Sequence, residues 1–268
     1  MTTLIDRTIA ALRTNHDDLS ALVRRLDAAE LERLSSASEW TVAQVLSHLG
    51  SGAEIGLASL RAALTGEDAP AQDFNQSVWA RWDAKGPKEH AEDFLSANAE
   101  LVATYESLDA EAREGLQIKL GFMPAPASVT LVAGMRLNEA ALHAWDIEAT
   151  FDPKAVIAPE ATEALVDFLP GPLSFLVGFI GKPGALESRP VTLRVEMSDP
   201  QRALGLTIGE TIEFGEPSES ADAVLTVPAE AWLRLVSGRL DAANTPGSVN
   251  VTGEAVSLDD LRRVFPGF

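Results

Sequence analysis

A carboxylate and an imidazole lie one helical turn apart near the middle of the chain. Glu139 and His143 are four residues apart in an otherwise apolar segment, so a helix places both side chains on one face. Asp146 continues this face three residues later, and Arg136 precedes Glu139 by three residues. Burying such groups on an apolar helix is costly unless they are paired or bind a cation. The spacing therefore fits either an ion pair or part of a metal site.

His48 is the second candidate ligand. It follows Thr41-Val42-Ala43-Gln44, which predicts a capping box at the start of a helix, and the small residues Ser51 and Gly52 leave room beside its ring. A hydrogen-bonded core histidine is one interpretation, and a metal ligand is the other. With Glu139 and His143 it would make a three-ligand site that keeps one position open for water or substrate.

The remaining candidates for chemistry are few. His16 interrupts an apolar helical stripe, so we expect a pocket wall or a hydrogen-bonded core residue. His90 is expected to be a solvated residue in the first turn of a helix, and Trp40 to be a hydrophobic staple before the capping box. The sequence has neither a Gly-rich phosphate loop after a predicted strand nor a Gly-x-Ser-x-Gly elbow.

The elements that must position these residues are helical up to about residue 150. Apolar residues at spacings of three and four indicate amphipathic helices, and the last of them is apolar on most sides. Such helices with short connections predict an antiparallel bundle of four or so helices. The expected helices are Ile5–Leu26, Thr41–Leu64, Phe74–Ala84, Lys88–Leu108 and Ser128–Thr150.

The pattern of apolar and polar residues changes after Asp152-Pro153. Beyond this point the two kinds of residue alternate, which predicts strands. We therefore expect an α+β chain with a helical domain at 1–152 and a small α+β domain at 153–268. The expected strands are Val191–Met197, Leu204–Ile208, Thr211–Phe214, Ala223–Val227 and Val249–Thr252, and the expected helices are Pro159–Phe168, Ala229–Ser237 and Leu258–Val264.

Composition excludes several classes of function. The formal net charge of −19 argues against a nucleic-acid or anionic-membrane partner, because phosphate binding needs clustered Lys and Arg. The absence of cysteine excludes disulfides, Cys-ligated zinc and a protein thiol nucleophile. The longest uncharged stretch, Leu120–Met135, is too short to span a bilayer, and no export signal is visible. We expect a soluble cytoplasmic protein, either a monomer or a small homo-oligomer.

Two groups of motifs resemble one known family. Glu39-Trp40-Thr41-Val42 leading to Leu46-Ser47-His48-Leu49, followed by Glu139-x-x-x-His143-Ala144-Trp145-Asp146, resembles the mycothiol-dependent maleylpyruvate isomerase family. These proteins have a DinB-like metal-binding bundle. Ser237-Gly238-Arg239 and Val251-Thr252-Gly253 resemble that family's sterol-carrier-protein-like C-terminal domain.

The resemblance implies a site and a cosubstrate. The family's zinc ligands fall on His48, Glu139 and His143, and its catalytic arginine falls on Arg239 or, as second choice, Arg234. Mycothiol would supply the reactive sulfur that this cysteine-free chain lacks. The expected activity is isomerisation of the maleylpyruvate type or transfer of the thiol to a small electrophile. A metal-dependent hydrolase and a non-catalytic small-ligand-binding protein remain the alternatives.

Overall fold

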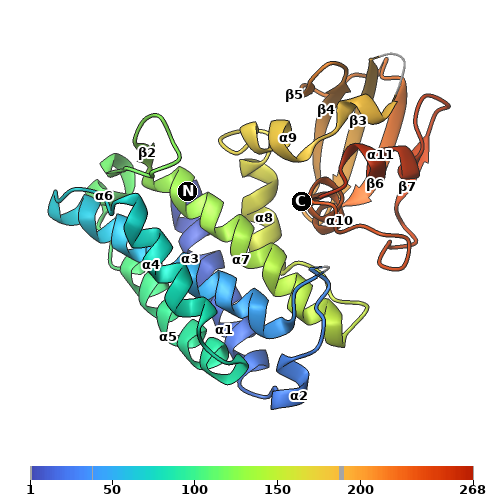
Figure 1. Cartoon of the computed structure of the whole chain (residues 1–268). Helices are drawn as coiled ribbons and strands as arrows, with labels where there is room; N and C mark the ends of the chain where they lie inside the picture. The colour runs from blue at the N-terminus through green and yellow to red at the C-terminus, as the bar shows by residue number, and fades with distance from the viewer. Residues whose placement is uncertain (1, 38, 187–189, 268) are drawn as a thin grey trace. The chain divides into compact units, whose positions relative to one another are not determined.

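The computed structural model describes residues 2–37, 39–186 and 190–267 and confirms the α+β class (Figure 1). Contacts divide the chain into two compact units, Met1–Ala155 and Val156–Phe268, each of which is described by itself. This division falls shortly after the expected boundary at residue 152. None of the helices among the described residues is both long and apolar enough to cross a membrane.

The first unit is built on four long helices. α1 packs against α5 and α7, and α3 packs against the same two helices, which forms a bundle. Shorter helices connect or flank these four. The long helices are α1 (Leu4–Val23), α3 (Val42–Thr65), α5 (Pro87–Glu106) and α7 (Val129–Phe151), and the shorter ones are α2 (Ala28–Leu31), α4 (Gln72–Asp83) and α6 (Ala110–Gly115).

Local sequence accounts for where these helices begin and which faces they bury. The Thr41 hydroxyl accepts a hydrogen bond from the Gln44 backbone N–H, and the Gln44 side chain accepts one from the Thr41 N–H, which confirms the predicted capping box of α3. α3 ends at Gly66, whose φ of 71° is a left-handed conformation. The apolar stripes meet in a core that includes Leu19, Val23, Val42, Leu46, Leu49, Phe94 and Ile147.

A short two-stranded ladder precedes α7, and the sequence patterns did not predict it. β1 (Gln117–Ile118) pairs antiparallel with β2 (Ala127–Ser128). Ile118 is buried, and the Ser128 side chain accepts from the Leu131 N–H at the start of α7. The ladder therefore fixes the point at which the helix carrying Glu139 and His143 begins.

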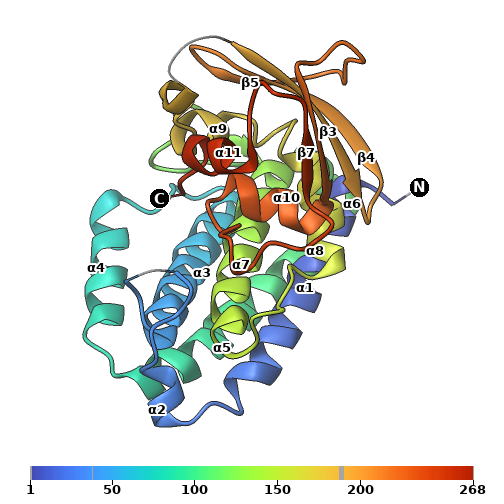
Figure 2. The same cartoon turned by 90° about the vertical axis from the view of Figure 1, so that its right-hand side faces the viewer.

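The second unit contains a five-stranded sheet in the order β5-β4-β3-β6-β7 (Figure 1; another view in Figure 2). β3 and β6 are parallel, and the other neighbouring pairs are antiparallel. The expected strands and helices of this half are confirmed, with small shifts at their ends. The strands are β3 (Val191–Ser198), β4 (Arg202–Ile208), β5 (Ile212–Gly215), β6 (Ala223–Pro228) and β7 (Asn250–Thr252), and the helices are α8 (Pro159–Phe168), α9 (Phe175–Ile180), η1 (Pro183–Leu186), α10 (Ala229–Val236) and α11 (Leu258–Val264).

The period-2 pattern of β3 explains how this sheet forms a core. Val191, Leu193 and Val195 alternate with less buried residues, so their apolar side chains share one face of the sheet. α10 contacts β3 and β6, and it also packs on α8 and α11. The expected likeness of this unit to a sterol-carrier domain stays a prediction.

Candidate metal centre

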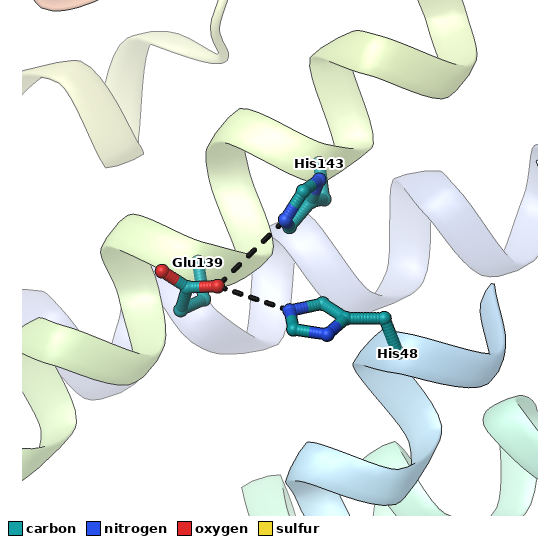
Figure 3. Close-up of side chains that lie close together, drawn as sticks. All are labelled: His48, Glu139 and His143. Atoms are coloured by element: carbon teal, nitrogen blue, oxygen red, sulfur yellow. Dashed lines mark hydrogen bonds and ion pairs between the residues drawn. The ribbon is translucent and has the colours of Figure 1, made fainter. Parts of the chain in front are cut away.

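Helices α3 and α7 bring the three predicted ligands together (Figure 3). His48 lies in the second turn of α3, whose start is set by the Thr41 cap, and Glu139 and His143 lie one turn apart on α7. His48 Nε2 is 3.2 Å from Glu139 Oε2, and His143 Nε2 is 3.7 Å from the same oxygen. One potential ligand atom from each residue lies within 4.8 Å of the others.

This donor set fits a divalent zinc ion. Two imidazole nitrogens and one carboxylate oxygen are common zinc ligands, and bonds of about 2.0–2.1 Å in a tetrahedron place ligand atoms roughly 3.3 Å apart. The spacings of 3.2 and 3.7 Å to Glu139 Oε2 are close to that value. Three protein ligands would leave a fourth position for a substrate or water.

Asp146 fixes the orientation of the His143 ring. The fully buried Asp146 accepts at Oδ2 from His143 Nδ1 over 2.8 Å. Because Nδ1 is used in this hydrogen bond, Nε2 is the nitrogen that remains for a ligand role. Through this direct contact Asp146 would orient His143 as a ligand.

Trp40 packs against both imidazoles, a contact that the staple interpretation did not anticipate. Its ring lies 5.2 Å from that of His48 and is stacked at 6.0 Å on that of His143, between centroids. The two imidazoles themselves meet edge to face at 4.9 Å. Trp40 therefore forms an aromatic wall of the site, and it is 38% exposed.

The three side chains lie at the surface of their unit rather than deep in the bundle. The side chains of His48, Glu139 and His143 are 41%, 48% and 13% exposed. Desolvation raises the pKa of Glu139, but the His48 hydrogen bond and the nearby charges of His143, His48 and Arg136 outweigh it. The pKa of Glu139 therefore lies below its usual value, and the group is ionised at neutral pH, as a carboxylate ligand must be.

The two candidate arginines lie in the second unit. Arg234 is almost fully buried, with its Nε and Nη2 donating to the Glu230 carboxylate and Nη1 donating to the Asn244 carbonyl. Arg239 is partly exposed, and its Nη1 donates to the Ser237 carbonyl. Arg234 therefore lies inside the fold of the second unit, whereas Arg239 is in part accessible to solvent.

The other histidines belong to the interior of the first unit. His16 is buried and accepts at Nδ1 from Asn98 Nδ2 over 2.9 Å, which confirms a satisfied core residue. The expectation of a solvated His90 is wrong. His90 is buried, its Nε2 bonds to the Trp82 carbonyl over 2.8 Å, and its ring is stacked with that of Trp82.

Comparison with known proteins places this geometry in context. The family model of the mycothiol maleylpyruvate isomerase N-terminal domain matches residues 12–148. Two similar solved structures are a mycothiol-dependent maleylpyruvate isomerase and a variant of that enzyme with a histidine replaced by alanine. Each has 16% identity and a TM-score of 0.62, and each match covers 95% of this chain and 97% of the other. No curated protein sequence matches the chain.

Proposed function

Since the chain belongs to the mycothiol maleylpyruvate isomerase family through its N-terminal domain, we propose that it is a zinc-dependent enzyme with mycothiol as cosubstrate. Its second substrate is a small electrophile. The reaction is an isomerisation of the maleylpyruvate type or the transfer of the thiol to that electrophile. The observation that carries the proposal is the cluster of His48, Glu139 and His143.

The residues of the cluster have distinct tasks. His48, Glu139 and His143 would hold the zinc ion, and Asp146 keeps Nε2 of His143 free for that role. When bound, zinc would supply an open position for the thiol and lower the pKa of that thiol, so that thiolate is available near neutral pH. Trp40 shields one side of both imidazoles from water.

The absence of cysteine supports an imported nucleophile. In an isomerase, the mycothiol thiolate adds to a conjugated double bond, the resulting single bond rotates, and elimination of the same thiolate returns the trans isomer. In a transferase, the carbon–sulfur bond is kept and the adduct takes up a proton. Arg239 is our candidate for binding a substrate carboxylate through paired hydrogen bonds, with Arg234 as the second candidate.

Metal content tests the ligand assignment. His48→Ala and His143→Ala should each abolish stoichiometric zinc and activity while the helical circular-dichroism signal persists, because both side chains are at least partly exposed. Glu100→Gln, which removes an exposed carboxylate on α5, is the control and should keep one zinc per chain. A full equivalent of tightly bound zinc in either histidine variant would show that the ligands lie elsewhere.

Thiol dependence tests the cosubstrate. A panel of small electrophiles is assayed with and without mycothiol, and products are identified by mass spectrometry. Mycothiol should raise the rate saturably, and simple thiols should substitute poorly because they lack the sugar's binding contacts. Full turnover in thiol-free buffer would identify a hydrolase. A freshly purified protein without metal and without turnover would favour a non-catalytic binding protein.

A further inference from the structure

The two helices that carry the candidate ligands pack mainly on other helices. α3 has its most extensive contact with α5, and α7 with α1, whereas the direct contact between α3 and α7 is smaller. His48 nevertheless meets Glu139 and His143 across this boundary (Figure 3). The 3.2 Å between His48 Nε2 and Glu139 Oε2 therefore depends on how α3 and α7 are aligned.

Arg136 links these two helices close to the candidate ligands. It lies on α7 three residues before Glu139, and its Nη2 donates to the Leu49 carbonyl of α3 over 2.9 Å. Leu49 is the residue after His48, so this hydrogen bond joins α7 to the turn of α3 that carries the histidine. A Cβ at Gly52 would be 3.3 Å from Arg136 Nη1. The guanidinium thus packs closely on the α3 backbone and has little room to shift on that side.

Two further residues hold Arg136 from the remaining long helices. Nη2 also donates to Asn98 Oδ1 of α5 over 2.7 Å, and Asn98 Nδ2 donates to His16 Nδ1 of α1 over 2.9 Å. Because Oδ1 only accepts and Nδ2 only donates, Arg136 sets which way the Asn98 amide faces. One chain of hydrogen bonds therefore connects α3, α7, α5 and α1.

This chain lies in the interior, and its members have the charges that it requires. The side chains of Asn98 and His16 are buried. Burial is the main cause that lowers the pKa of His16, so its imidazole is neutral at neutral pH and Nδ1 can accept. Burial lowers the pKa of Arg136 to about 10, so the guanidinium stays charged. Because a buried polar group that loses its partner is costly, the chain favours a single arrangement.

We propose that Arg136 and Asn98 are positioning residues of the candidate metal centre, which hold the His48 turn of α3 in register with α7. Neither residue would touch the metal ion or a substrate. The consequence for metal binding rests on the proposed function, whereas the alignment of the three side chains does not. Loss of either residue should leave a folded bundle in which the candidate ligands no longer converge as closely.

Zinc affinity of the full chain, measured by competition with a chelator, tests this role. Binding should be at least about tenfold weaker in Arg136→Met and about threefold weaker in Asn98→Leu, because a metal site needs its ligands held closely in place. Asn98→Asp keeps an acceptor for Arg136 and should retain most of the affinity. Circular dichroism confirms that each variant is folded under the conditions of the titration.

Leu101→Ala is the matched control. Leu101 is buried on α5, one turn after Asn98, and it takes no part in the chain of hydrogen bonds. Its truncation leaves a cavity in the core and should lower the free energy of unfolding. Zinc affinity should stay that of wild type, because the contacts of Arg136 remain.

A second readout needs no metal. Trp40 precedes the cap of α3, and its ring stacks on that of His143 on α7, so its indole N–H resonance is sensitive to how the two helices are aligned. In the metal-free full chain, this resonance is assigned by its loss in Trp40→Phe. It should shift by more than its linewidth in Arg136→Met and Asn98→Leu and stay in place in Leu101→Ala.

The outcomes are separable. Unchanged zinc affinity in the Arg136 and Asn98 variants overturns the inference, as does a lower affinity with an unmoved Trp40 resonance. An equal loss of affinity in Leu101→Ala also overturns it, since stability of the bundle would then be the cause. If Arg136→Met does not fold, Asn98→Leu decides by the same criteria. If wild type binds no zinc, the proposed function is rejected, and the Trp40 resonance alone decides: a shift supports the alignment, and its absence overturns it.

Discussion

His143 is held on two sides, by the Asp146 carboxylate at Nδ1 and by the Trp40 ring that stacks on its imidazole. These contacts restrict the ring before a ligand arrives, so less conformational entropy is lost on binding. At the scale of single residues, the affinity of the candidate site for a metal would therefore depend on groups that do not themselves contact the ion.

Asp146→Asn should lower zinc affinity about 10–100-fold, because such outer partners orient a ligating histidine and raise its basicity. Competition with a chelator of known affinity measures the change. Asp83→Asn, on the exposed end of α4, is the control and should bind zinc like wild type. Equal affinities for all three proteins would mean that the His143–Asp146 hydrogen bond is irrelevant to the metal.

The sequence predicts which three candidate ligands lie together better than it predicts the side chains around them. Glu139 and His143 lie on one helix, so spacing alone pairs them. The contact of Trp40 with two rings and the stacking of His90 on Trp82 depend on how separate helices pack. That packing is a property of the whole bundle, which explains why the predictions of a staple at Trp40 and a solvated His90 missed these contacts.

At the scale of elements, the approach of α4 to α3 depends on one glycine. A Cβ at Gly50 would lie 2.1 Å from the Trp82 ring, which is fully buried and also donates from Nε1 to Glu54. A rigid buried indole has nowhere to move, so the two helices would have to separate.

Gly50→Ala should therefore destabilise the protein by about 1–3 kcal/mol despite the better helix propensity of alanine. Gly56→Ala on the same helix is the matched control, since its Cβ would meet only Leu101 at an ordinary 3.7 Å. That variant should be neutral or slightly more stable. Urea unfolding measures both, and an equal change in the two variants would exclude the clash with Trp82 as the cause.

The packing of α1 on α7 makes the stability of the folded state depend on pH. Burial, with a further contribution from the Asp18 carboxylate, raises the pKa of Glu148 to about 7. The folded state therefore holds a proton that the unfolded state releases above about pH 4.5. The stabilisation from Glu148 is complete below that pH and is lost as the pH rises through 7.

The free energy of unfolding of Glu148→Gln should match that of wild type near pH 4.5 and exceed it by about 1–2 kcal/mol at pH 8. This difference is smaller than a fully buried carboxyl would give, because Glu148 is partly exposed. Unfolding in urea across this pH range measures the difference. Glu111→Gln, exposed on α6, should show no such trend. A stability difference that shrinks with rising pH would contradict the assignment to Glu148.

Element boundaries are largely readable from the sequence because caps and periodicity are local signals. The Thr41 cap and the alternation in β3 place α3 and β3 within a residue or two of their observed ends. The ladder of β1 and β2 has only two residues per strand, too few for any period to appear. Its pairing is made by tertiary contacts such as burial of Ile118.

At the scale of the whole molecule, the first unit has its own core and all three candidate ligands. A fragment of residues 1–155 should fold, as followed by circular dichroism, and bind one zinc per chain. It should lack most of the mycothiol-dependent activity, since Arg239 is absent. Full activity in the fragment would remove any catalytic role for Arg239 and Arg234, and loss of zinc binding in a folded fragment would contradict the ligand assignment.

The central place of β3 in the sheet makes one of its edges depend on a strand that comes later in the chain. β4 follows β3 directly and covers one edge, and β5 pairs with β4, whereas β6 covers the other edge (Figure 1). Without Ala223–Pro228, the apolar residues of β3 flank an open row of backbone N–H and C=O groups, which readily pair with other chains. A chain truncated between β5 and β6 is therefore expected to aggregate, whereas the full chain keeps this edge covered.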